Sequence, residues 1–259
     1  MNIPDSQIAV TLYNLREFCK TESDLDSTLD KLCEIGYQAV QVSGVPLEPA
    51  VIKKQLDKHN LYCCATHDSL AMINEDTQKL IDKMHTLECD FVALGAPPID
   101  YVQNKDKFAE LINIFNEKGA ELLAEGIKLG YHNHHFEFAH LEPHKPTLEL
   151  FYERTNPKCV FSELDVHWVQ RGGANPETWI RKLDGRIPVI HFKDFAIVDR
   201  NAVYCEIGEG NLEWDKIIQA CRDTNVRWYS IEQDEPFPGR DIFESVKISF
   251  NNLKAMGVK

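Results

Sequence analysis

Four acidic or imidazole side chains recur in the second half of this chain, each at the end of an apolar run. They are Asp165, His191, Glu232 and either Glu137 or His132. Carboxylate oxygens and neutral imidazole nitrogens are common ligands of divalent cations. If the apolar runs are strands of a parallel barrel, their carboxyl ends converge on one mouth. The sequence therefore predicts one metal site at that mouth.

Three oxygen donors and one imidazole would form a hard site, which favours Mn²⁺, Mg²⁺ or Co²⁺ and leaves Zn²⁺ as a further candidate. An open coordination position would let a hydroxy-ketone bind through two oxygens. The metal would then polarise the carbonyl and ease removal of the adjacent proton. We therefore expect proton transfer on a sugar or keto-sugar, through a metal-stabilised enediolate.

The densest polar segment reads Gly-Tyr-His-Asn-His-His-Phe-Glu-Phe from Gly130 to Phe138. Strand alternation places His132 and His134 on one face. Both follow a buried run, so we expect both in the pocket, whereas His135 has the pattern of a solvated loop residue.

Asp165 closes a strand that a barrel would bury on both sides. An unpaired carboxylate there would be costly, so it needs a cation or strong donors. His167, two residues later, fits either a pocket wall or a packed core position.

Lys193 and Asp194 directly follow the apolar run that ends at His191 and Phe192. Two interpretations stay open: a surface ion pair between them, or a lysine at the mouth that holds a sugar hydroxyl or stabilises a developing enolate. Asp234 is expected to be a solvated loop charge.

His67 follows the third apolar run, either as an acid/base partner or as a capping side chain. Tyr13, Trp168 and Phe192 could offer apolar faces to a sugar ring or pack in the core.

Eight strand-helix units position these residues. Short apolar runs alternate with amphipathic stretches, the pattern of a parallel sheet wound with helices. The expected strands are Gln7–Leu12, Gln38–Val42, Leu61–Thr66, Asp90–Leu94, Ile127–His132, Cys159–Leu164, Ile187–Phe192 and Arg227–Ile231.

The expected helices begin near Ser23 and then cover Pro49–His59, Asp76–Leu87, Lys105–Glu125, Thr147–Glu153, Pro176–Leu183, Trp214–Thr224 and Ile242–Ala255. Eight units in 259 residues predict a single-domain (β/α)8 TIM barrel over residues 1–259. A doubly wound sheet would favour a glycine-rich turn where this chain reads Tyr-Asn-Leu-Arg from Tyr13. Two insertions, Phe136–Pro146 and Phe195–Asn211, are expected to shape the pocket.

The formal net charge of −13 disfavours nucleic acid and anionic membranes as partners. No stretch has the roughly 18 apolar residues of a membrane span, and the first residues do not resemble a secretion signal. We expect a cytoplasmic protein with a small-molecule substrate; the number of subunits stays open, and a homo-oligomer is one expectation.

At these residues the chain resembles the xylose isomerase-like TIM barrels, a superfamily of sugar isomerases and epimerases that also includes dehydratases and DNA repair endonucleases. The resemblance is strongest at Leu164-Asp165, at His191-Phe192-Lys193-Asp194 and at Gly208-Glu209-Gly210. It implies one divalent metal held by a Glu, an Asp, a His and a Glu on strands five to eight. The last three correspond to Asp165, His191 and Glu232.

The strand-five ligand is open, because the chain reads His132-Asn133-His134 where the family carries Glu-Asn-His. Either His132 binds the metal or Glu137 reaches it from the loop; we favour Glu137, which keeps the site rich in oxygen. In the family, the glutamates of strands five and eight act as a paired acid and base. The resemblance then implies that His134 replaces one of these glutamates here.

The resemblance implies a sugar isomerase or epimerase in which Glu232 and His134 move protons, with Lys193 and His67 as further catalytic candidates. A keto-sugar lyase or dehydratase is the close alternative, because a histidine-rich strand five suits elimination. A non-catalytic sugar-binding barrel is the third, distinguished by sugar binding without metal.

Overall fold

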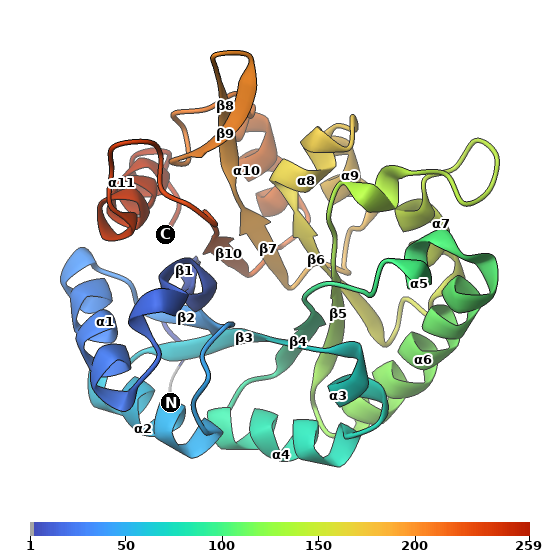
Figure 1. Cartoon of the computed structure of the whole chain (residues 1–259), viewed down its shortest axis with the longest axis horizontal. Coiled ribbons are helices and arrows are strands. Elements are labelled where there is room, and N and C mark those ends of the chain that lie inside the picture. Colours follow the sequence, from blue (N-terminus) through green and yellow to red (C-terminus); the bar gives the residue numbers. More distant parts are fainter. Residues whose placement is uncertain (1–2) are drawn as a thin grey trace.

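Eight strands close into a parallel barrel. In the computed structural model, which describes residues 3–259, the strand order around the barrel is β1-β10-β7-β6-β5-β4-β3-β2. Figure 1 shows these strands at the centre of a ring of helices. The strands are β1 (Ile8–Thr11), β2 (Ala39–Val42), β3 (Tyr62–Asp68), β4 (Phe91–Leu94), β5 (Lys128–His132), β6 (Val160–Asp165), β7 (Val189–Phe192) and β10 (Trp228–Ile231). The predicted (β/α)8 TIM barrel is confirmed, and each expected strand overlaps an observed one.

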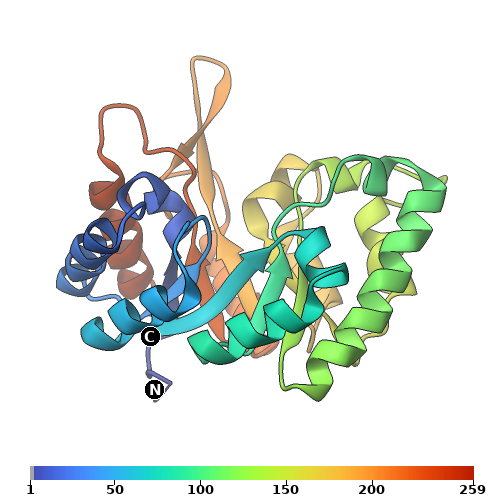
Figure 2. The ribbon, with the colours of Figure 1, turned by 60° about the horizontal axis from the view of Figure 1, so that its bottom comes forward.

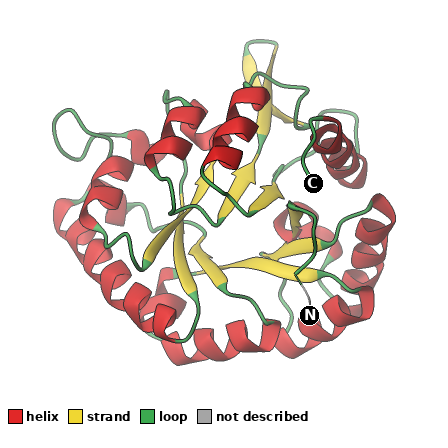
Figure 3. Ribbon diagram, turned by 180° about the vertical axis from the view of Figure 1, so that it is seen from behind, coloured by secondary structure: helices red, strands yellow, loops and turns green. Residues whose placement is uncertain are grey.

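The described chain has eight longer helices, and Figure 3 shows from behind that helices surround the barrel. The first begins at Glu22, one residue before the expected Ser23, because Thr21 and Asp24 form a capping box, and Gly36 caps its end with φ of 115°. The eight are α1 (Glu22–Ile35), α2 (Pro49–His59), α4 (Thr77–Leu87), α6 (Lys105–Ala124), α7 (Thr147–Arg154), α9 (Pro176–Lys182), α10 (Trp214–Asp223) and α11 (Ile242–Ala255).

Short helical segments occupy several strand-to-helix connections and were not predicted. They are η1 (Leu12–Phe18), α3 (Leu70–Asn74), α5 (Asp100–Gln103), η2 (Phe136–Phe138) and α8 (Val166–Arg171). Four of them, η1, α3, η2 and α8, begin within four residues of the end of a barrel strand. They therefore build the rim of the mouth.

The expected insertion after β7 is an antiparallel hairpin of β8 (Asp194–Val198) and β9 (Asn201–Cys205). Its turn residues Asp199 and Arg200 have φ of 49° and 68°, the left-handed pair that tight hairpin turns need. Figure 2 shows the hairpin extending away from the barrel.

Apolar side chains fill two regions. One cluster lies between strands and helices and includes Ile8, Val10, Val40 and Leu129. The alternate strand positions form a smaller cluster, which includes Ala9, Ala39, Phe91, Ala93, Val189 and Trp228. Because strand side chains alternate, every second residue of a strand faces the barrel interior. These inward-facing residues are apolar in this cluster and polar nearer the carboxyl ends of the strands.

Across residues 3–259, the structure contains no helix with the length and apolar character needed to cross a bilayer.

Candidate metal centre

Four of the five residues expected as ligands lie together at the barrel mouth. His132 ends β5, Asp165 ends β6, His191 lies in β7 and Glu232 directly follows β10; these four strands are consecutive neighbours in the barrel. One potential ligand atom from each side chain lies within 4.8 Å of the others. All four side chains are buried.

Three of these side chains contain a buried polar atom without a hydrogen-bond partner in the described chain. The atoms are His132 Nδ1, Asp165 Oδ2 and His191 Nδ1. The two imidazole nitrogens lie 3.3 Å from carboxylate oxygens of Glu163 and Glu232, respectively. Buried polar atoms are rarely left unsatisfied, because their desolvation is not offset. This donor set therefore fits a divalent cation.

Burial and charged neighbours set the protonation of the four groups. Burial raises the pKa of Asp165 to about 8 and lowers the pKa of His132 to about 4, so that histidine is neutral and able to coordinate. Burial acts to raise the pKa of Glu232, but Lys193 and His191 outweigh it and hold that pKa well below its usual range. Burial acts to lower the pKa of His191, but the carboxylates of Glu163 and Glu232 raise it well above its usual range.

Glu163 lies beneath this cluster and was missed in the sequence. Its Oε1 accepts a hydrogen bond from Gln41 Nε2 at 3.0 Å, and its Oε2 accepts one from His67 Nε2. Oε2 also lies 3.3 Å from His132 Nδ1 and 3.4 Å from His191 Nε2. Gln41 Oε1 in turn lies 2.7 Å from His191 Nε2. The Glu163 carboxylate is thus already well supplied with donors, and it supports the cluster from below.

A second grouping with metal-ligand spacing consists of His67, His132, Glu163 and His191. Burial acts to raise the pKa of Glu163, but His191 and His67 hold it well below its usual range. Because direct hydrogen bonds already satisfy Glu163, the upper group, with its unpartnered atoms, is the better cation site.

Glu137, the favoured strand-five ligand, is not part of either grouping. Its carboxylate is fully buried and accepts hydrogen bonds from the Tyr131 hydroxyl and the His134 backbone N–H, both at 2.9 Å. Burial raises its pKa to about 7. Since alternation along β5 directs Tyr131 and His132 to opposite faces, a carboxylate bonded to Tyr131 lies away from the barrel interior. The structure therefore places His132, and not Glu137, beside Asp165, His191 and Glu232.

Lys193 is buried at the mouth beside Glu232. Its amine lies 3.3 Å from Glu232 Oε2 and 2.5 Å from Asp234 Oδ2. It also lies 4.8 Å and 4.7 Å from the ring centres of Trp168 and Tyr204. Burial acts to lower the pKa of Lys193, but Glu232, Asp165 and Asp234 raise it above its usual range. Lys193 is therefore a fixed cation, and Asp234, expected to be a solvated charge, is its ion-pair partner.

Asp194 has a structural role and does not pair with Lys193. Its buried carboxylate accepts five hydrogen bonds, from the backbone N–H groups of Phe195, Gly208, Gly210 and Leu212 and from the indole of Trp214. It therefore ties the base of the β8–β9 hairpin to the loop that follows it.

A cavity of about 320 Å³ opens at this mouth, within the size range of small-molecule sites. It is lined by Tyr13, Ser43, His67, Gly95, Ala96, His132, His134, Trp168, Lys193, Glu232 and Asp234. Phe192, in contrast, is fully buried in the core.

Two further histidines of the sequence prediction lie at this cavity, and a third does not. Burial lowers the pKa of His134 to about 2, so it is neutral, and its Nδ1 has no partner within residues 3–259. His67 lies between Ser43 Oγ, at 3.1 Å, and Glu163. His167 is fully buried against Phe195 and Tyr204 and does not line the cavity.

The comparison with family models matches the description "Xylose isomerase-like TIM barrel" over residues 29–249. The chain belongs to this family.

Solved structures resemble this xylose isomerase-like barrel over nearly its whole length. A sugar phosphate isomerase/epimerase from Parabacteroides distasonis is 25% identical with a TM-score of 0.83, covering 99% of this chain and 96% of its own. A probable 3-DHS dehydratase from Bacillus anthracis is 16% identical with a TM-score of 0.72, covering 96% and 98%. A D-allulose 3-epimerase from Methylomonas sp., solved with D-allulose, is 11% identical with a TM-score of 0.73, covering 99% of both chains. The last two likenesses establish the fold alone. A search of curated protein sequences finds no significant match.

Proposed function

We propose that this barrel is a divalent-metal-dependent isomerase or epimerase that transfers protons on a sugar or keto-sugar. The observation that carries the proposal is the group of buried polar atoms of His132, Asp165 and His191 that lack hydrogen-bond partners beside Glu232. Two members of the group, His132 and Glu232, line the mouth cavity. A buried lysine at the same cavity provides a fixed positive charge next to the site.

The ligands would be His132, Asp165, His191 and Glu232. Two imidazoles and two carboxylates form a softer set than the expected three oxygens and one nitrogen, so Mn²⁺, Co²⁺ or Zn²⁺ fits better than Mg²⁺. A cation bound there would polarise a substrate carbonyl and acidify the adjacent C–H group.

The other groups have roles that follow from their charge and position. Glu232 is ionised and is suited to accept a proton, while the neutral His134 can exchange one through a ring nitrogen. Lys193 would stabilise negative charge that develops on a substrate oxygen. His67 also lines the cavity, but Ser43 and Glu163 engage both of its ring nitrogens, so it is suited to hold the Glu163 carboxylate in place. Trp168 offers an apolar wall to the sugar ring.

The relatives support a sugar substrate. The structure with 25% identity is named a sugar phosphate isomerase/epimerase, and others with the same fold are named ribulose and allulose 3-epimerases. The substrate of this chain is not identified by these names. Free and phosphorylated sugars are therefore both test compounds.

A keto-sugar lyase or dehydratase is the second candidate. With His132 at the strand-five position, Glu232 and Asp234 are the two carboxylates that line the cavity, and Asp234 makes the shorter contact with Lys193. A single carboxylate base, Glu232, beside the neutral His132 and His134 suits removal of one proton followed by loss of a hydroxyl group. The fold is also that of a probable 3-DHS dehydratase.

Incubation in D₂O distinguishes these reactions. Free and terminally phosphorylated ketopentoses and ketohexoses would be incubated with the Mn²⁺-loaded protein and followed by NMR. An epimerase gives an epimer that carries deuterium, whereas a dehydratase gives a product lacking one water. The Lys193→Met variant should lose most of the activity. A metal-loaded protein that introduces no deuterium and no double bond into any of these compounds would contradict the proposed function.

A further inference from the structure

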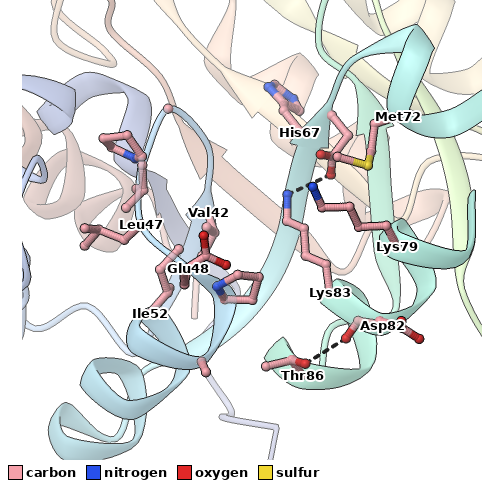
Figure 4. Close-up of a pocket in the computed structure, with 16 residues that line it drawn as sticks. Val42, Leu47, Glu48, Ile52, His67, Met72, Lys79, Asp82, Lys83 and Thr86 are labelled. Atoms are coloured by element: carbon pink, nitrogen blue, oxygen red, sulfur yellow. Dashed lines mark hydrogen bonds and ion pairs between the residues drawn. The ribbon is translucent and has the colours of Figure 1, made fainter. Parts of the chain in front are cut away.

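A second and larger hollow adjoins the barrel mouth, between α2 and α4. This groove has a volume of about 760 Å³, which is large enough for a drug-sized group. Figure 4 shows its two walls: Leu47, Glu48 and Ile52 on the α2 side, and residues of α4 on the other, with His67 between them at one end.

The groove adjoins the candidate site at His67. That residue lines both the groove and the mouth cavity. The loop after β2 is likewise shared, because Ser43 lines the mouth and the next residue, Gly44, lines the groove. A group attached to a sugar in the mouth would reach the groove by passing beside His67.

Part of the groove wall is apolar. Its lining includes Val42, Val45, Leu47, Ile52 and Met72, of which Val45, Leu47 and Met72 are only partly buried against the main core. Burying an apolar group against such a surface is favourable by roughly 25 cal/mol per Å².

The charges on the groove disfavour an anionic occupant. Three acids, Glu48, Asp68 and Asp82, and two lysines line it. One of these lysines, Lys83, already forms an ion pair with Asp68 at 2.8 Å. The remaining lysine, Lys79, is exposed at the rim. A phosphate would thus meet more negative than positive charge.

We propose that this groove is a subsite for an uncharged, apolar, ring-sized group attached to the sugar, such as the aglycone of a glycoside whose sugar ring keeps a ketone at another carbon. The inference rests on the proposed function, in that the mouth cavity is taken to hold the sugar. It narrows the substrate from a free monosaccharide to a sugar conjugate.

Calorimetric binding of matched glycosides tests the subsite. Phenyl and methyl β-glycosides of glucose, galactose and xylose would be titrated into the wild-type protein, without any need for turnover. For at least one sugar we expect the phenyl glycoside to bind about tenfold more tightly than the methyl glycoside. Ala50→Trp, at an exposed position in the groove, should abolish this preference by filling the groove, and Leu47→Glu should abolish it by placing a charge there.

The control is Leu123→Glu, which changes a 37% exposed leucine of α6 outside the groove and should keep the preference. The subsite is ruled out if no phenyl glycoside is preferred, or if the preference survives in both groove variants. Mn²⁺ titration of the same proteins separates this inference from the proposed function: a phenyl preference in a protein that binds no Mn²⁺ would uphold the subsite and contradict the metal enzyme.

Discussion

Two candidate ligands, Asp165 and His191, have raised pKa values, so each holds a proton where a cation would bind. Burial raises the pKa of Asp165 to about 8, and the carboxylates around His191 raise that group's pKa well above its usual range despite burial. A cation must displace a proton from such groups before it can coordinate them.

Mn²⁺ affinity should therefore depend on pH. Since the pKa of Asp165 is raised, the group is protonated below about pH 8, and it competes with the metal more strongly as the pH falls. We expect the Kd for Mn²⁺ to rise about tenfold for each pH unit below that value, for a single displaced proton. Calorimetry in buffers of different ionisation enthalpy measures the released proton directly. An affinity that is constant between about pH 6 and pH 8 would contradict this account of Asp165.

The strand-five ligand can be identified with two variants. His132→Ala removes a donor of the cluster and should weaken Mn²⁺ binding at least about tenfold. Glu137→Gln keeps acceptor and donor groups beside Tyr131 and His134 and should leave the affinity within about twofold. If Mn²⁺ affinity is lost in Glu137→Gln and kept in His132→Ala, Glu137 is the strand-five ligand, as expected from the sequence.

Glu163 should position the ligands without binding the metal. Glu163→Gln removes the charge that faces His67, His132 and His191 while keeping a similar shape. Because partners behind ligand histidines typically contribute 10- to 100-fold to affinity, we expect a loss of about that size. The matched control is Glu153→Gln, a surface residue paired with Lys145, which should bind Mn²⁺ like the wild type. Unchanged affinity in Glu163→Gln would show that the network does not support the site.

Several residues of the cluster could be predicted from the sequence, because polar side chains at the carboxyl ends of parallel barrel strands converge on one mouth. Asp165, His191 and Glu232 follow this rule. Glu163 was missed although alternation puts it on the same face as Asp165, because it stands inside the apolar run and not at its end. Glu137 lies outside the cluster because it bonds to Tyr131, and strand alternation directs Tyr131 and His132 to opposite faces; the choice of strand-five ligand stays a prediction.

At the level of elements, periodicity predicts the barrel strands and the long helices, since each has enough residues to show a repeat. The hairpin of β8 and β9 and the short helices show no such signal. They depend on tertiary contacts, and the clearest example is Asp194, whose carboxylate gathers N–H groups from four backbone positions.

This anchor predicts a specific glycine requirement. A Cβ on Gly210 would lie 2.2 Å from Oδ1 of Asp194, so Gly210→Ala must displace the carboxylate or the loop. We expect a loss of unfolding free energy of about 2–3 kcal/mol, typical of overpacking, measured by denaturant unfolding. Gly126→Ala is the control, because a Cβ there meets nothing within 4 Å and only the φ of 79° is unfavourable. Equal losses in the two variants would argue against the Asp194 anchor.

For the whole molecule, the site exists only when the barrel is closed. Its proposed ligands come from four adjacent strands, while His67 and Gln41 reach the network from β3 and β2 on the other part of the wall. A cation that binds the folded barrel and not the unfolded chain stabilises the fold by about 2.7 kcal/mol at roughly 100 times its Kd. For a chain of 259 residues this corresponds to a rise in Tm of roughly 5–10 °C.

The overall acidity of the chain agrees with a small-molecule substrate. The net charge of −13 would repel a polyanion such as nucleic acid, whereas a small neutral sugar would not be repelled. The cytoplasmic location and the assembly into a homo-oligomer stay predictions from the sequence.

The most direct test of the central claim is Mn²⁺ titration of chelator-treated protein, wild type beside Asp165→Asn, with Tm recorded with and without the metal. The control is Asp30→Asn, at an exposed position of α1. We expect one Mn²⁺ per chain and a raised Tm for the wild type and the control, with both effects lost in Asp165→Asn. Equal Mn²⁺ binding by all three proteins, or none by the wild type, would contradict a metal centre at the barrel mouth.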